Sequence, residues 1–156
     1  MTASAPLELH RATIRPEWVD GNRHVNVAYH VVIFDHVTDS LLDRIGLDKA
    51  GREVHGGSVF IAEAHMTYQR EVVEGGSVVM TTQILSHGEK RLHFLRRMQH
   101  VESEKTIATG EWVGLYVDLA LRDATVMPKP IRTAVADLVE SHRHPPWPNE
   151  AACAIR

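Results

Sequence analysis

The chain has 156 residues, 44% of them hydrophobic and 24% charged, which suits one globular domain with a sizeable core. Its formal net charge of −3 gives no reason to expect nucleic acid or an anionic membrane as a partner. The single cysteine, Cys153, excludes an internal disulfide, and no apolar run approaches the roughly 20 residues that span a bilayer. We therefore expect a cytoplasmic protein that contacts neither membranes nor nucleic acids.

Strand and helix signals come first along the chain. Residues 7–14 predict a strand, and an apolar run with a period of 3.6 residues predicts a helix at 27–45. Asn26 is a favourable N-cap, and Gly46 stands where helices usually end. Because apolar residues cover more than half of the girth of this helix, we expect other elements to enclose it.

The pattern changes to a period of two after a connector at 47–57. Strands are predicted at 58–70, 77–85, 91–101 and 106–117. Four strands in a row with short turns between them indicate an antiparallel meander, whose apolar face packs on the helix. A short helix is predicted at 131–140. We assign residues 1–141 to a single α+β domain and expect the Pro-rich residues 142–156 to form a poorly ordered tail.

Asp20 is the first candidate for chemistry. It opens the turn Asp20-Gly21-Asn22-Arg23-His24-Val25-Asn26, just before the helix N-terminus, where unpaired backbone N–H groups carry a partial positive charge. A carboxylate next to donors that stabilise an oxyanion is suited to hydrolytic chemistry. A purely structural role explains the same residue, because Asp commonly hydrogen-bonds the backbone of its own turn. The residues alone leave both interpretations open.

Metal binding is the question that eleven histidines raise. The histidines are scattered, and Glu63-Ala64-His65 is the one compact carboxylate and imidazole pair in a predicted strand. The chain has neither an HExxH motif nor paired cysteines. We therefore expect no metal site.

The order of these features resembles the hotdog fold, in which a curved antiparallel sheet wraps around one long central helix. The chain is similar to the 4-hydroxybenzoyl-CoA thioesterase-like acyl-CoA thioesterases, and most of all to their betainyl-CoA thioesterase branch. The resemblance covers roughly residues 7–138. It rests on the Asp20 turn, on helix residues 34–42, and on the later stretches Gly57-Ser58-Val59-Phe60-Ile61-Ala62-Glu63-Ala64-His65, Lys90-Arg91-Leu92-His93, Ala108-Thr109-Gly110-Glu111 and Val117-Asp118.

The resemblance implies hydrolysis of a small or medium acyl-CoA to the free acid and coenzyme A, with coenzyme A as part of the substrate and no further cofactor. It implies that Asp20 attacks the thioester or activates a water, assisted by His24 and Asn26. The backbone N–H groups of Val27 and Ala28 then stabilise the oxyanion. It also implies a homodimer or homotetramer, because hotdog proteins cover exposed strand edges by pairing their sheets.

Two positions depart from the family pattern. Arg23 stands where the family usually has Gly, and His30 stands where an aromatic residue, usually Tyr, is common. These changes bear on the acyl group. A quaternary ammonium group such as betainyl requires an aromatic wall and a carboxylate, whereas Arg23 favours an anionic or polar group. We keep both hypotheses.

Further candidate residues are chosen by type and position. Those for substrate contact or support of the catalytic groups are Arg23, Tyr29, His30, Glu63, His65 and Glu111. Those for the phosphates of coenzyme A are Lys90, Arg91, Arg96 and Arg97, although a solvated strand edge explains these four equally well. Glu111 lies on an apolar strand face and needs a partner, for which we consider His65, Arg91 or a second subunit.

Two other functions are kept as alternatives. One is a hotdog enoyl-CoA hydratase or dehydratase, and the other is a non-catalytic protein that binds an acyl group. The hydratase motif places its His five residues after Asp, whereas His24 follows Asp20 by four. This spacing favours the thioesterase.

Overall fold

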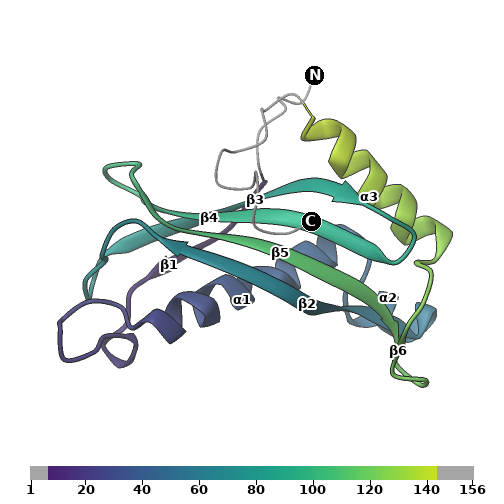
Figure 1. Cartoon of the computed structure of the whole chain (residues 1–156), viewed down its shortest axis with the longest axis horizontal. Coiled ribbons are helices and arrows are strands. Elements are labelled where there is room, and N and C mark those ends of the chain that lie inside the picture. The colour runs from purple at the N-terminus through teal and green to yellow at the C-terminus, as the bar shows by residue number, and fades with distance from the viewer. Residues whose placement is uncertain (1–6, 144–156) are drawn as a thin grey trace.

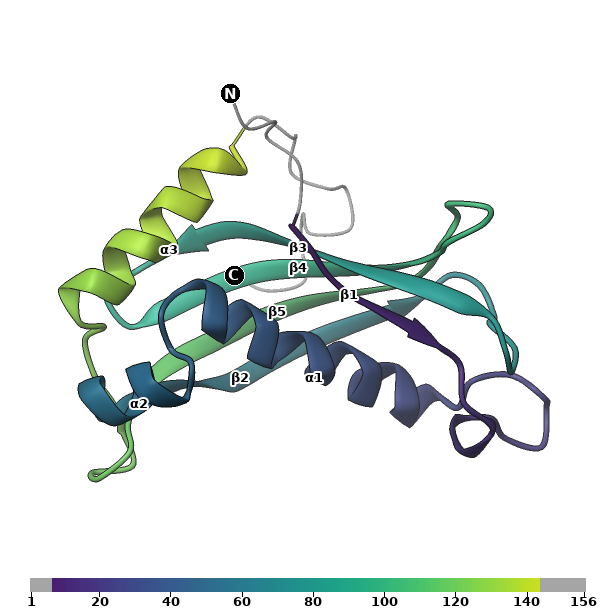
Figure 2. The ribbon, with the colours of Figure 1, turned by 180° about the vertical axis from the view of Figure 1, so that it is seen from behind.

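The structure is a computed structural model and describes residues 7–143. In chain order its elements are β1 (Leu7–Thr13), the 3-10 helix η1 (Pro16–Trp18), α1 (Val27–Arg44), α2 (Lys49–His55), β2 (Gly57–Tyr68), β3 (Ser77–His87), β4 (Arg91–His100), β5 (Thr106–Asp118), β6 (Asp123–Ala124) and α3 (Lys129–Ser141). Figure 1 shows the curved sheet, and Figure 2 shows α1 lying along its inner face with α3 at one end. The predicted α+β class, a curved antiparallel sheet around one long helix, is confirmed. No helix among the described residues is long and apolar enough to cross a membrane.

The sheet has the strand order β1-β3-β4-β5-β2, with β6 paired to β5, and all pairs are antiparallel. β3, β4 and β5 form consecutive hairpins, as predicted. The predicted meander of four strands is wrong at β2, because β2 pairs with β5 at the far edge and not with β3. Residues 69–76 connect β2 to β3, and this connection is longer than the about two to five residues of most hairpin loops. The alternation of apolar and polar residues shows which face of a strand is buried, but it does not show which strand lies next to it.

The core lies between α1 and the inner face of the sheet. The most deeply buried residues of α1 are Ile33, Phe34, Val37 and Leu41, which confirms the predicted apolar stripe. The helix is less enclosed than predicted, because Val27, Val31 and Val32 are exposed on another side.

Arg96 of β4 lies inside this core, with 1% of its area exposed. Its Nη1 donates hydrogen bonds to the Phe34 carbonyl oxygen (2.9 Å) and to Thr38 Oγ1 (2.8 Å) of α1. The guanidinium also lies over the Phe94 ring, 4.7 Å from its centroid. Burial lowers the pKa of Arg96 to about 9. The prediction that Arg96 binds a phosphate of coenzyme A is therefore wrong, because this side chain ties α1 to the sheet.

α3 packs against β3, and the residue that follows it completes the contact. His142 is 3% exposed, and its Nδ1 accepts a hydrogen bond from the Ile84 N–H at 2.9 Å. Within the described residues β1 pairs with β3 as far as Thr82, so the imidazole covers a donor at the edge of the sheet. The predicted tail therefore begins too early, since His142 is part of the folded domain. Its remainder, residues 144–156, lies outside the described residues.

The His142 contact makes stability depend on pH. Burial lowers the pKa of His142 below 6.5, and a protonated ring cannot accept the Ile84 N–H. The folded-state pKa is below the unfolded one, so the unfolded chain binds the proton first and stability is lost as the pH falls below about 6.5. We expect the melting temperature to fall more steeply on acidification in the wild type than in His142→Asn, whose amide oxygen can accept the same hydrogen bond. An equal fall of the melting temperature with pH in both proteins would contradict this prediction.

Candidate functional site

The turn from Asp20 to Asn26 joins η1 to α1 and is held by its own backbone. The Asp20 N–H donates to the His24 carbonyl oxygen (3.1 Å), and the Arg23 N–H donates to the Asp20 carbonyl oxygen (2.9 Å). The Asp20 carboxylate takes part through Oδ1, which accepts the Asn22 N–H at 2.8 Å. The interpretation that Asp20 hydrogen-bonds the backbone of its own turn is thus correct for one carboxylate oxygen. Oδ2 has no hydrogen-bond partner among residues 7–143, and 27% of the side chain is exposed.

The N-terminus of α1 leaves one backbone donor unused. Asn26 caps the helix, because its Oδ1 accepts the Ala28 N–H at 2.9 Å and its carbonyl oxygen accepts the Tyr29 N–H at 2.9 Å. The prediction of Ala28 as an oxyanion donor is therefore wrong, since the cap already occupies its N–H. The Val27 N–H has no partner in the described part of the chain. It is the donor that this helix N-terminus offers.

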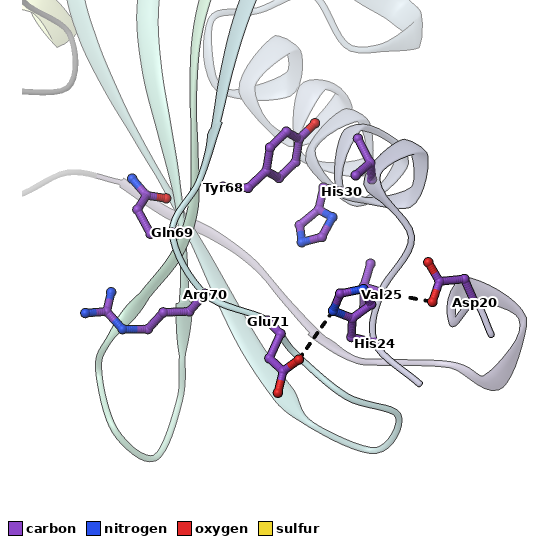
Figure 3. Close-up of a pocket in the computed structure, with 9 residues that line it drawn as sticks. Asp20, His24, Val25, His30, Tyr68, Gln69, Arg70 and Glu71 are labelled. Atoms are coloured by element: carbon purple, nitrogen blue, oxygen red, sulfur yellow. Dashed lines mark ion pairs between the residues drawn. The ribbon is translucent and has the colours of Figure 1, made fainter. Parts of the chain in front are cut away.

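A pocket of about 380 Å³ opens between the Asp20 turn, the first turns of α1 and the end of β2. Its lining residues are Asp20, His24, Val25, Val27, His30, Tyr68, Gln69, Arg70 and Glu71. Figure 3 shows Tyr68 and His30 close together, with Asp20 across the pocket from Tyr68. The connection at 69–76 is fixed to the turn, because the Val25 N–H donates to the Val72 carbonyl oxygen at 2.9 Å. The segment whose course the predicted meander misses therefore forms a wall of the site.

His24 lies between two carboxylates. Its Nε2 is 3.9 Å from Asp20 Oδ1, and its Nδ1 is 3.4 Å from Glu71 Oε2, as the dashed lines in Figure 3 mark. The structure thus brings His24 to Asp20, as predicted. Glu71 is a site residue that the sequence analysis missed, because it stands in a connection without a motif and only the fold carries it to His24. Because a carboxylate lies on each side of the His24 ring, the ring restricts the positions that the Asp20 carboxylate can adopt.

His30 is the most buried polar side chain of the pocket, with 5% of its area exposed. Its Nδ1 is 3.2 Å from the Asn26 carbonyl oxygen. The His30 and Tyr68 rings meet edge-on, with centroids 5.1 Å apart. Burial lowers the pKa of His30 below 6.5, and the nearby His24 acts in the same direction. His30 is therefore neutral at pH 7.

Glu111 has a partner, but not one of those predicted. Its Oε1 is 2.8 Å from His93 Nε2, and both side chains are at most 4% exposed. His93 pairs in register with Val113, so it stands diagonally next to Glu111 on the sheet face that points away from α1. The predicted pair Glu63 and His65 lies on the exposed edge strand β2, with His65 opposite Glu111 in the register. These residues are all outside the Asp20 pocket.

The basic residues predicted to bind coenzyme A are dispersed. Lys90 and Arg91 lie at the turn between β3 and β4, where Arg91 pairs with Leu115 of β5. Tyr68, which lines the pocket, pairs with Ala108 near the other end of β5. In one protomer Lys90 and Arg91 are therefore roughly 20 Å from the pocket along the sheet. The other predicted residues outside the pocket lining are Arg23, Asn26, Ala28, Tyr29, Arg96 and Arg97.

Metal ligands do not gather in the part of the chain that the structure describes. Residues 7–143 contain no group of three or more His, Cys, Asp or Glu side chains that could hold a metal ion. At His24 the two nearby carboxylates lie on opposite edges of the ring, Asp20 at Nε2 (3.9 Å) and Glu71 at Nδ1 (3.4 Å), so they do not converge with one ring nitrogen on a single ion.

Arg23 adopts a backbone conformation that favours glycine, with φ at 65°. Such a conformation costs a residue with a side chain about 1–2 kcal/mol. We expect Arg23→Gly to raise the free energy of unfolding by about 0.5–1 kcal/mol, because the greater backbone entropy of unfolded Gly offsets part of the gain. Arg23→Ala removes the same side chain and keeps the strain, so the denaturant midpoint should rise for Gly alone. A rise for both variants would assign the effect to the side chain instead of the backbone.

Curated relatives of this chain include proteins named as betainyl-CoA thioesterases. The model of the thioesterase-like superfamily matches residues 14–152. A betainyl-CoA thioesterase of Pseudomonas aeruginosa is 34% identical over 145 residues, which cover 93% of this chain and 91% of that relative. An L-carnitine dehydrogenase/betainyl-CoA thioesterase of Agrobacterium fabrum is 33% identical over 157 residues, which cover 99% of this chain and 31% of that longer protein.

Two solved structures share the fold. A putative thioesterase of Pseudomonas putida superimposes with a TM-score of 0.82 at 32% sequence identity, over 97% of both chains. A Staphylococcus aureus protein solved in complex with CoA superimposes with a TM-score of 0.87 at 24% identity, over 100% of this chain and 99% of that one. The second likeness concerns the fold alone.

Proposed function

Because this chain belongs to the thioesterase-like superfamily and is an acyl-CoA thioesterase, we propose that the thioester binds in the Asp20 pocket and that Asp20 supplies the reacting carboxylate. One observation carries this assignment. Among residues 7–143, the Asp20 carboxylate has one oxygen anchored by the Asn22 N–H and the other without a partner, and its pocket also contains Val27, whose N–H has no partner there either. A nucleophilic or basic oxygen and an oxyanion donor in one pocket are what thioester hydrolysis requires.

Two routes fit this geometry. In the first, Asp20 Oδ2 takes a proton from a water whose oxygen forms the new bond to the carbonyl carbon. In the second, Oδ2 itself forms that bond, and water then hydrolyses the resulting anhydride. In both routes the C–S bond breaks and coenzyme A leaves as its thiolate, which takes up a proton. Transfer of ¹⁸O from labelled water into Asp20 during one turnover would identify the second route.

The supporting groups follow from their positions. The Val27 N–H, at the positive end of the α1 dipole, stabilises the negative charge on the carbonyl oxygen. Asn26 keeps this end of the helix in place by accepting the Ala28 N–H. His24, between Asp20 and Glu71, positions the reacting carboxylate.

We further propose that the protein works as a homodimer or a larger homo-oligomer. β2 is an edge strand of the sheet. The exposed apolar residues on β2 and on the adjoining side of α1 are Phe60, Ile61, Tyr68, Val27 and Val31. Pairing of two β2 edges about a two-fold axis would cover this edge. Sedimentation should show a dimer or tetramer, and Ile61→Lys should weaken it; a monomer at all concentrations would contradict the proposal.

An oligomer of this kind also gives Lys90 and Arg91 a role. A two-fold axis at β2 reverses one sheet relative to the other, so the far end of one subunit approaches the pocket of its partner. Lys90 and Arg91 would then meet the phosphates of coenzyme A across the subunit boundary. Lys90→Ala with Arg91→Ala should raise KM for the CoA thioester and leave KM for a short pantetheine thioester, which lacks the nucleotide, unchanged.

The pocket favours a small polar acyl group over a long aliphatic one. Its volume is about 380 Å³, and His30, Tyr68 and Glu71 lie in its lining. Betainyl-CoA, which the names of the relatives specify, is one thioester with a small polar acyl group.

Thiol release from a panel of CoA thioesters tests the proposed function. The panel contains acetyl-, butyryl-, palmitoyl-, benzoyl- and betainyl-CoA. We expect hydrolysis with a preference for small acyl groups. A folded protein that hydrolyses none of them would contradict the function, and a preference for palmitoyl-CoA would contradict the proposed size of the acyl pocket.

A further inference from the structure

The pocket wall contains a buried polar atom, His30 Nε2, that has no hydrogen-bond partner within the part of the chain that the structure describes. Figure 3 places the His30 ring between Tyr68 and His24, facing the interior of the pocket. An unpaired buried acceptor or donor costs about 1–3 kcal/mol, so such a group in a pocket is a candidate contact for a ligand.

The hydrogen bond at the other ring nitrogen determines what Nε2 can do. Nδ1 is 3.2 Å from the Asn26 carbonyl oxygen, and a carbonyl oxygen only accepts. Nδ1 therefore carries the hydrogen of the neutral ring, and Nε2 presents a lone pair. The ring stays neutral at pH 7 because burial lowers its pKa. The pocket wall thus contains a hydrogen-bond acceptor that requires an O–H or N–H.

No group among residues 7–143 supplies that donor. The nearest aromatic neighbour is the Tyr68 ring, which meets the imidazole edge-on. The Arg70 guanidinium is directed elsewhere, because its Nη1 donates to the Thr106 carbonyl oxygen at 2.8 Å. Tyr68 is 42% exposed, so its ring can turn aside for a ligand without loss of core packing.

The position of His30 on α1 indicates which part of the substrate reaches it. Val27 and His30 are three residues apart and therefore lie on the same face of the helix. The His30 ring reaches back toward the helix N-terminus, because its Nδ1 is 3.2 Å from the Asn26 carbonyl oxygen, so it lies beside the first turn, which carries the Val27 N–H. With the thioester carbonyl oxygen at that N–H, Nε2 is within reach of the first carbons of the acyl chain.

We propose that the acyl group of the substrate carries a hydroxyl or N–H on its second or third carbon, and that His30 selects it by accepting a hydrogen bond at Nε2. This inference rests on the proposed function, because it takes the thioester to bind at Asp20 and Val27. His30 is then the residue that determines acyl specificity, at a position where the family usually has Tyr. A betainyl group has neither a hydroxyl nor an N–H, so this chain would differ from its betainyl-CoA relatives in the acyl group that it prefers.

Matched substrates that differ by one hydroxyl test the proposal. We compare kcat/KM for butyryl-CoA with that for 2-hydroxybutyryl- and 3-hydroxybutyryl-CoA. For the wild type we expect a preference of about 10- to 100-fold for one hydroxyacyl substrate, since the hydroxyl pairs a buried acceptor. In His30→Phe the ratio should fall toward one. In His30→Gln, whose amide oxygen is an acceptor, part of the preference should return.

The outcomes distinguish this inference from the proposed function. Hydrolysis of all three substrates at equal rates by the wild type would overturn the inference and leave the thioesterase standing. Equal losses on all substrates in His30→Phe would also overturn it, because Nε2 would then serve a group common to every CoA thioester. Failure of the wild type to hydrolyse any thioester would overturn both. Circular dichroism establishes that each variant is folded before its ratio is measured.

Discussion

Asp20→Asn is expected to lower kcat for thioester hydrolysis by about 10²–10⁴-fold without unfolding the protein. Asn retains an oxygen that accepts the Asn22 N–H, so the 2.8 Å hydrogen bond of the turn is kept. The variant loses the negative charge of the free carboxylate oxygen, which can then neither take a proton from water nor attack the carbonyl carbon. Thiol release at saturating substrate measures the loss, and thermal melting measures the fold.

Glu71→Gln is the matched control for this experiment. It neutralises a second carboxylate of the same pocket, which approaches the same imidazole, and its side chain is 70% exposed. We expect a much smaller loss of kcat, because Glu71 acts on the reaction only through His24. Equal losses in the two variants would show that the total charge of the pocket matters more than the position of Asp20. An Asp20→Asn enzyme with the wild-type rate would show that the proposed mechanism is wrong.

The long helix was predictable because its signals are local. The predicted range 27–45 agrees with the observed Val27–Arg44, and the predicted N-cap Asn26 accepts the Ala28 N–H with its side chain. The thioesterase family and the hotdog fold are confirmed as well. They could be predicted because the Asp20 turn, this helix and the later motifs follow one another in a fixed order, which the sequence shows directly.

Apart from Ala28, whose N–H is occupied by the neighbouring Asn26 cap, the errors concern contacts between residues distant in the sequence. Alternation did not predict the bulge between Ile61 and Glu63 or the pairing of β2 with β5, so the course of residues 69–76 and the position of Glu71 were missed. Arg96 and Arg97 are adjacent on one strand and face opposite sides of the sheet. Arginine is mostly found at protein surfaces, so the residue type alone predicts an exposed side chain. The fold buries Arg96 because α1 presents the Phe34 carbonyl oxygen and Thr38 Oγ1 to its guanidinium.

The position of Val27 allows one backbone donor to be removed without loss of the helix. Val27 is the first residue of α1, where proline is well tolerated because the helix does not use that N–H. Asn26 has φ −61° and ψ 143°, the extended conformation that a residue before proline prefers. Val27→Pro is therefore expected to keep the fold and to lower kcat by about 10²–10³-fold, the usual cost of losing an oxyanion donor.

Val27→Ala is the matched control, because it shortens the exposed side chain and keeps the N–H. Its kcat should stay close to that of the wild type. In Val27→Pro the loss should appear in kcat more than in KM, since the charge on the carbonyl oxygen develops only in the transition state. A Val27→Pro enzyme with the wild-type kcat would exclude the α1 N-terminus as the oxyanion site. Because the Ala28 N–H is already occupied by Asn26, the donor would then have to come from outside this helix end.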